Sequence, residues 1–118
     1  MAGWGATNER GRNPAQVLQF LDVNVTDPDD CADIYKTRGG ILTPLQQMCA
    51  GGKKGQDSCV GDSGSALMKE TTHNPPVYKI IGVVSFGPKL CGTEGVPGVY
   101  TRIRYGKHFF LRNYSMTF

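Results

Sequence analysis

Four cysteines, Cys31, Cys49, Cys59 and Cys91, constrain the fold of this chain more than any other feature. An even number of cysteines in a short, glycine-rich chain is typical of a disulfide framework formed outside the reducing cytosol. The residues alone leave the pairing open. A zinc site is the competing interpretation, but the spacings of 17, 9 and 31 intervening residues contain no C-x-x-C pair, which disfavours zinc. We therefore expect disulfides, no metal and no cofactor.

Short apolar runs separated by turn-forming residues indicate strands. The chain has 118 residues, enough for one domain, and its 16 glycines and 7 prolines indicate many tight turns. Between positions 17 and 25 the odd positions are apolar except Gln19, which predicts one strand. Further strands are expected at 45–50, 65–69, 77–86 and 98–103, with helical turns at 31–36 and a closing helix at 105–114. The pattern predicts an all-β domain, an antiparallel barrel or sandwich with a carboxy-terminal helix.

Charge and hydropathy limit the classes of partner that the chain is expected to bind. The net charge is only +3, and the 13 lysines and arginines are scattered, so we expect no nucleic-acid partner. No apolar run approaches the roughly 18 residues of a membrane span, so we expect no membrane partner. The first residues lack the features of a signal peptide, whereas the cysteines indicate export. We expect a secreted, extracellular protein whose signal lies outside this sequence.

Two N-x-S/T triplets begin at Asn24 and Asn113. Each can accept a glycan in a secreted protein, although such triplets also arise by chance. A glycan on Asn24 requires that the expected strand leave this side chain exposed.

Several motifs, in a fixed order along nearly the whole chain, resemble the chymotrypsin and trypsin family of serine endopeptidases. The motifs are Ala2-Gly3-Trp4-Gly5, Gly61-Asp62-Ser63-Gly64 preceded by Cys59, Val84-Ser85-Phe86-Gly87, and Pro97-Gly98-Val99-Tyr100-Thr101-Arg102. The run from 82 to 102 looks most like the arthropod clip-domain branch, whose members act in haemolymph cascades. The resemblance implies that residues 1–118 are the carboxy-terminal part of a trypsin-like peptidase domain. Their fold would be the second, six-stranded Greek-key barrel of a two-barrel protein.

The resemblance also implies roles around Ser63. Ser63 matches the nucleophile, and the backbone N–H groups of Gly61 and Ser63 match the oxyanion hole. Asp62 matches the aspartate that pairs with the amino terminus created by zymogen cleavage. Gly-Ser-Ala replaces the usual Gly-Gly-Pro after the motif, and Ser65 puts the detailed geometry of the loop in doubt.

A substrate pocket is implied as well. Asp57 matches a pocket floor that selects Arg or Lys, because a buried carboxylate makes a charge-assisted contact with a cation. The remaining residues of the implied pocket would be Ser58, the edge-strand residues Ser85 and Phe86, and the two walls Gly87 and Gly98. The family pairing of the cysteines joins Cys31 to Cys49 and Cys59 to Cys91.

The base that would activate Ser63 is not evident. Both histidines, His73 and His108, follow Ser63, and neither matches the catalytic histidine of the family, which comes from the first barrel together with its aspartate. A serine hydroxyl needs an adjacent base to attack at neutral pH. We expect this chain to be a fragment that is inactive alone and needs the missing amino-terminal barrel as a partner.

The expected function is that of a trypsin-like serine endopeptidase, a zymogen that cleaves protein or peptide substrates after Arg or Lys and meets an inhibitor of the serpin type. Two alternatives stay open. A non-catalytic homologue would act as a binding partner in a cascade, although Ser63, Asp62 and Asp57 argue against it. An ester hydrolase of the G-x-S-x-G type would need glycine at position 65, where this chain has serine.

Overall fold

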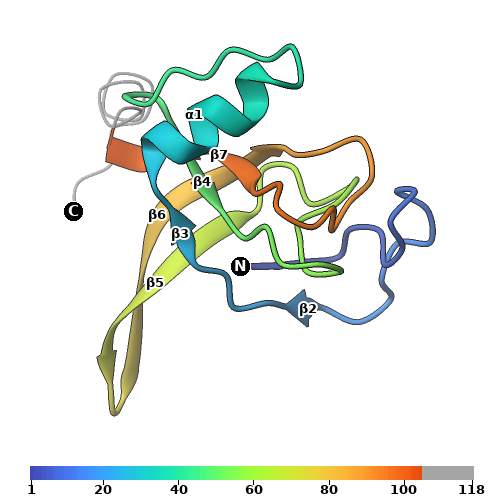
Figure 1. Cartoon of the computed structure of the whole chain (residues 1–118). Coiled ribbons are helices and arrows are strands. Elements are labelled where there is room, and N and C mark those ends of the chain that lie inside the picture. Colours follow the sequence, from blue (N-terminus) through green and yellow to red (C-terminus); the bar gives the residue numbers. More distant parts are fainter. Residues whose placement is uncertain (105–118) are drawn as a thin grey trace, which may run out of the picture.

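The structure, a computed structural model, describes residues 1–104, so the helix expected at 105–114 lies outside the described residues. Residues 1–104 form seven strands and one helix (Figure 1). The elements in chain order are β1 (Ala2–Gly3), β2 (Gln19–Phe20), β3 (Val25–Thr26), α1 (Pro28–Lys36), β4 (Gln47–Ala50), β5 (Ala66–His73), β6 (Pro76–Phe86) and β7 (Gly98–Arg102).

All strand pairs are antiparallel, which confirms the predicted all-β class. One sheet has the order β3-β4-β7-β6-β5, and β1 pairs with β2 in a second sheet. The single strand predicted at 17–25 is instead two short strands with different partners. Ala2 pairs with Phe20, whereas Thr26 pairs with Cys49, so the chain crosses from one sheet to the other between them.

Helix α1 begins earlier than the predicted helical turns. The Asp27 carboxylate caps it by accepting hydrogen bonds from the amides of Asp29 at 2.9 Å and Asp30 at 3.3 Å. Pro28 occupies the first turn, where its missing N–H costs no helical hydrogen bond. The helix buries Cys31 and Tyr35, and the Cys31–Cys49 disulfide ties it to β4.

The sheet is buried on both faces at its centre. One cluster, on the α1 face, contains Cys31, Tyr35, Cys49, Val96 and Val99, and the opposite cluster contains Met48, Ala50, Leu67, Val84 and Tyr100. Successive residues of a strand point to opposite faces, so adjacent residues of β4 and β7 contribute to different clusters. The centre of the sheet therefore gives β6 and β7 a rigid base, and the loop at 87–97, which connects the end of β6 to the start of β7, lies beside the candidate site.

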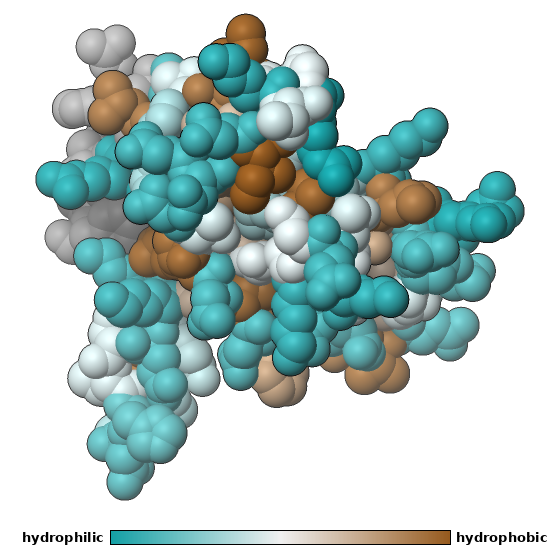
Figure 2. Space-filling view, in the orientation of Figure 1, coloured by the Kyte–Doolittle hydropathy of each residue, from teal (hydrophilic) through white to brown (hydrophobic). Residues whose placement is uncertain are grey.

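Strands β5 and β6 form a long hairpin that projects from the body (Figure 1). Leu67 is the last buried residue of β5, and positions 68–80 are all exposed. Figure 2 shows mostly hydrophilic and intermediate residues on this projection. The sequence predicted that this strand ends at Lys69, whereas β5 continues to His73. Residues 70–73 show no alternation of apolar and polar residues because both faces of the hairpin are solvated there, so the pattern does not reveal the rest of the strand.

Candidate functional site

The loop from 57 to 65 joins β4 to β5 and is organised around the carboxylate of Asp62. Asp62 is 6% exposed, and it accepts hydrogen bonds from the amides of Gly5 at 2.8 Å and Cys59 at 3.0 Å. A Cβ atom at Gly3 or Gly5 would collide with the Asp62 carboxylate. Glycine at these two positions therefore lets the amino-terminal segment close over the loop.

Ser63 lies on the outer side of this loop and is exposed. The glycines around it have positive φ angles, 97° at Gly61 and 87° at Gly64, which side chains disfavour. The Gly64 amide donates to the Val84 carbonyl at 2.9 Å, which fixes the loop to β6. Among the hydrogen bonds within residues 1–104, none is donated by the amide of Gly61 or Ser63. Both donors are thus available to an external acceptor.

Asp57 has a half-buried carboxylate with one satisfied oxygen. Oδ2 accepts a hydrogen bond from the Gly92 amide at 3.1 Å, whereas Oδ1 is buried and has no hydrogen-bond partner among the described residues. Burial raises the pKa of Asp57 above 3.8, and the nearby backbone amides of Gly92 and Ser58 oppose that rise. An unpaired buried carboxylate oxygen is costly, which favours binding of a cation here.

Two glycines border the Asp57 carboxylate. A Cβ atom at Gly98 would lie 2.9 Å from Oδ1, and one at Gly87 would lie 3.6 Å from Oδ2. Ser58, which is 6% exposed, brings its Oγ within 3.4 Å of the same Gly98 position. Gly87, Gly98, Ser58 and Asp57 therefore lie together. The space beside the carboxylate exists because glycine has no side chain at positions 87 and 98.

The end of β6 is supported from beneath by α1. The β6–β7 pairing shifts between Val84 and Phe86, so Ser85 is left as an extra residue at a bulge. The exposed Phe86 ring meets Tyr35 edge to face, with the ring centroids 5.7 Å apart. The Tyr35 hydroxyl donates to the Pro97 carbonyl, and burial, followed by the charge of Asp57, raises the pKa of Tyr35 to about 12.

The Cys59–Cys91 disulfide joins the loop of Ser63 to the loop beside Asp57. Gly92, next to Cys91, donates to the Asp57 carboxylate and packs closely on Gly55. The bridge and this contact fix the two loops relative to each other. Both disulfides present are those that the resemblance implied.

A hollow of about 220 Å³ opens between the amino-terminal segment and the Ser63 loop. Its lining includes Gly3, Gly5, Phe20, Asp57 and Asp62. It therefore gives access to the buried side of the loop.

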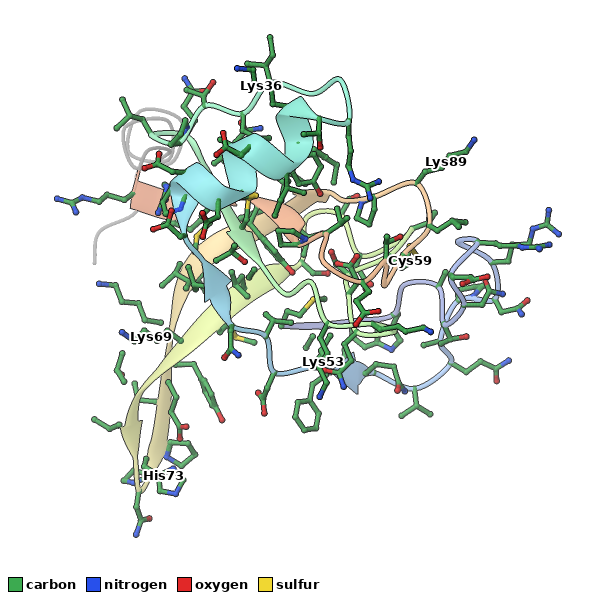
Figure 3. All side chains as sticks on the ribbon, viewed as in Figure 1. Lys36, Lys53, Cys59, Lys69, His73 and Lys89 are labelled. Atoms are coloured by element: carbon green, nitrogen blue, oxygen red, sulfur yellow. A yellow bond between two sulfur atoms is a disulfide. The ribbon has the colours of Figure 1, made fainter. Side chains whose placement is uncertain are left out.

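His73 is far from Ser63. Its side chain is 94% exposed at the tip of the hairpin, where Nδ1 lies 3.1 Å from Oε1 of Glu70. Figure 3 shows His73 at the end of the projection, well separated from Cys59 on the body. The other histidine, His108, lies outside the described residues. In residues 1–104 no histidine is placed to accept the Ser63 proton.

Three contributors were not assigned site roles from the sequence. Gly92 donates a hydrogen bond to Asp57, Tyr35 supports Phe86, and Tyr100 contacts Ser58. Burial raises the pKa of Tyr100, and the hydrogen bond with the Ser58 side chain has the opposite, smaller effect. Their positions depend on long-range packing, so only the position of Gly92 directly after Cys91 gave a local signal.

Within the described part of the chain, no group of three acidic, histidine or cysteine side chains is arranged to hold a metal ion. The one helix there is too short to cross a membrane.

Comparison with known proteins agrees with this geometry. The trypsin family profile matches residues 1–109. CLIP domain-containing serine protease B4 of Anopheles gambiae is 44% identical over 102 residues, which cover 86% of this chain and 27% of the relative. Melanization protease 1 of Drosophila melanogaster is 44% identical over 104 residues, covering 87% and 25%. Phenoloxidase-activating factor 3 of Holotrichia diomphalia is 42% identical over 103 residues, covering 87% and 28%.

The fold, the Ser63 loop and these matches define a serine-protease class of domain. The chain belongs to the trypsin family. It spans about a quarter of the length of the curated relatives it matches.

Proposed function

We propose that this chain is the substrate-binding and nucleophile-bearing part of a secreted trypsin-like endopeptidase that cleaves proteins after Arg or Lys. The single observation that carries this proposal is the Asp57 carboxylate. Its Oδ1 atom is buried, has no hydrogen-bond partner within residues 1–104, and is bordered by Gly87 and Gly98, which leave room for a long side chain. A guanidinium or ammonium group there would satisfy the oxygen by a charge-assisted hydrogen bond.

In this proposal Ser63 attacks the carbonyl carbon of the scissile peptide bond and forms an acyl-enzyme. The amides of Gly61 and Ser63 donate to the negative oxygen of the tetrahedral intermediate. Ser85 and Phe86 present the end of β6 to the substrate backbone, and the Cys59–Cys91 bridge keeps Asp57 in register with Ser63. The amine leaves with a proton returned by the base, and water then hydrolyses the acyl-enzyme.

The base and its orienting aspartate are proposed to come from an amino-terminal barrel, in the part of the relatives that this chain does not span. This proposal is supported by the position of His73 at the tip of the hairpin, well separated from Cys59 on the body. The chain alone is accordingly proposed to be inactive. A fluorophosphonate probe should leave Ser63 unmodified in the isolated chain, and rapid labelling would contradict this.

Activation is proposed to act through Asp62. Cleavage of a zymogen would create a new amino terminus, and its ammonium group would enter the 220 Å³ hollow and pair with the Asp62 carboxylate. This charge pair would order the amides of Gly61 and Ser63. The protein would thus be a zymogen that another protease switches on.

The setting is proposed to be an extracellular proteolytic cascade. The names of relatives refer to melanization and to phenoloxidase activation, and two disulfides suit an oxidising compartment. The partners would be a protein substrate, an activating protease and an inhibitor of the serpin type.

The test uses the activated full-length protein that contains this chain and a series of peptide amides differing only in the residue before the scissile bond. We expect hydrolysis after Arg and Lys and little after Phe or Glu. Ser63→Ala should abolish turnover with binding of benzamidine retained, and Asp57→Ser should lose both benzamidine binding and the preference for Arg. Binding of cascade proteins without any hydrolysis would instead support the non-catalytic homologue.

A further inference from the structure

Asn24 is the last residue of the irregular segment between β2 and β3, and the other two residues of its N-x-T triplet form β3. The residue between Asn24 and Thr26 is Val25, so no proline blocks the triplet. Leu21 and Val23 are half-buried, whereas Asp22 and Asn24 are exposed, so alternate residues face the core and the solvent. The Asn24 side chain is therefore on the solvent side, which the sequence alone left open.

The backbone of Asn24 is held while its side chain remains free. The Gly51 amide donates to the Asn24 carbonyl at 2.9 Å, and Val25 pairs with Ala50 in β4. No hydrogen bond involving the Asn24 side chain occurs within residues 1–104. A modification of the amide nitrogen thus breaks no contact in the described structure.

The surroundings of Asn24 also suit a bulky polar group. Strand β3 is at the edge of the five-stranded sheet, and within residues 1–104 it pairs only with β4 (Figure 1). Val25, next to Asn24, is 57% exposed on this edge. An exposed strand edge with an apolar side chain favours self-association, and covering such an edge prevents it.

We propose that Asn24 carries an asparagine-linked oligosaccharide that covers the free edge of β3. This inference rests on the secretory route in the proposed function, but not on proteolysis. The donor is a lipid-linked oligosaccharide. The Asn24 Nδ2 atom attacks C1 of its first sugar, the bond from C1 to the lipid diphosphate breaks, and a C1–Nδ2 bond forms. Nδ2 loses one proton, and the lipid diphosphate leaves.

The glycan would not interfere with the candidate active site. Asn24 does not line the hollow of about 220 Å³ that reaches Asp57, and β3 lies at the opposite edge of the sheet from β5, which follows the Ser63 loop. We therefore expect glycosylated and enzymatically deglycosylated protein to bind benzamidine equally well.

The test is translation of the whole chain behind a cleavable secretion signal in the presence of microsomes. Protease-protected chains are treated with peptide N-glycosidase in heavy-oxygen water, which labels each residue that carried a glycan, and the peptides are weighed. An Asn113→Gln background removes the second triplet. Because the glycan is added during translocation, the measurement does not require a folded product.

We expect label at residue 24 in the Asn113→Gln chain, loss of the label in Asn24→Gln and Thr26→Ala, and retention in Thr26→Ser. The last variant is the matched control, since it changes β3 but keeps the hydroxyl. Protected chains without label at residue 24 would overturn the inference and leave the proposed protease function intact. Label at residue 24 in a protein that hydrolyses no peptide would support the glycan at Asn24 and contradict the proposed protease function.

Discussion

At the scale of single residues, the partly buried Asp57 carboxylate destabilises the fold when it is ionised. Burial raises its pKa above 3.8, so over the pH range between 3.8 and the raised pKa the folded state binds more protons than the unfolded state. The contribution of Asp57 to stability is therefore fully present below pH 3.8 and is lost as pH rises through the raised pKa.

Asp57→Asn should consequently increase the free energy of unfolding of the full protein more at neutral pH than at about pH 3. Denaturant titrations of the disulfide-intact protein at the two pH values measure this difference. An identical effect of Asp57→Asn at both pH values would contradict the prediction.

Gly98 and Gly87 should respond differently to alanine. A Cβ atom at Gly98 would be 2.9 Å from Asp57 Oδ1, too close without a shift, whereas the 3.6 Å approach at Gly87 is an ordinary contact. We expect Gly98→Ala to cost about 1–3 kcal/mol of stability and Gly87→Ala less than about 1 kcal/mol. Both should lower kcat/KM for Arg substrates, Gly98→Ala more strongly. Equal stability losses in thermal unfolding would refute this ordering.

At the scale of elements, local pattern predicted strands well where part of the strand is buried. β4, β6 and β7 lie within two residues of the ranges expected from alternation and turns. The run from 17 to 25 was predicted as one strand because alternation does not show which partner each residue pairs with, and here the partner changes from β1 to β4.

In the candidate site, too, short local motifs could be read from the sequence, whereas contacts between distant segments could not. Its main residues could be predicted because they occupy motifs a few residues long, such as Gly61-Asp62-Ser63-Gly64. The contact of Asp62 with Gly5 spans 57 positions and depends on how the amino-terminal segment packs, so no local pattern predicts it. The same holds for Tyr35 beneath Phe86.

The two disulfides should differ in their effect on specificity. They close separations of 18 and 32 residues, for which the chain-entropy relation gives about 3 and about 4 kcal/mol. Replacing both Cys59 and Cys91 by alanine should also reduce the preference for Arg over Phe substrates, because Gly92 then loses its fixed position beside Asp57. The Cys31 and Cys49 pair of alanine substitutions is the control and should largely preserve that preference. Equal losses of preference in kinetic assays would argue against this role of the bridge.

At the scale of the whole molecule, the hairpin of β5 and β6 separates His73 from the candidate catalytic face. His73→Ala in the activated full-length protein should leave kcat/KM within about two-fold, because surface substitutions away from a site have small effects. Ser63→Ala should lower turnover by about 10⁶-fold. Initial rates with one Arg amide substrate measure both. A large loss of activity in His73→Ala would show that the hairpin reaches the active site.

The same projection offers an attachment point. Positions 71–80 are solvent-exposed, and exposed loop tips tolerate insertions best. A short peptide tag between Asn74 and Pro75 would anchor the protein to a bead or sensor chip by the end of the hairpin, away from the body that carries Cys59. Macromolecules could then approach the body of the immobilised protein from solution without obstruction by the support.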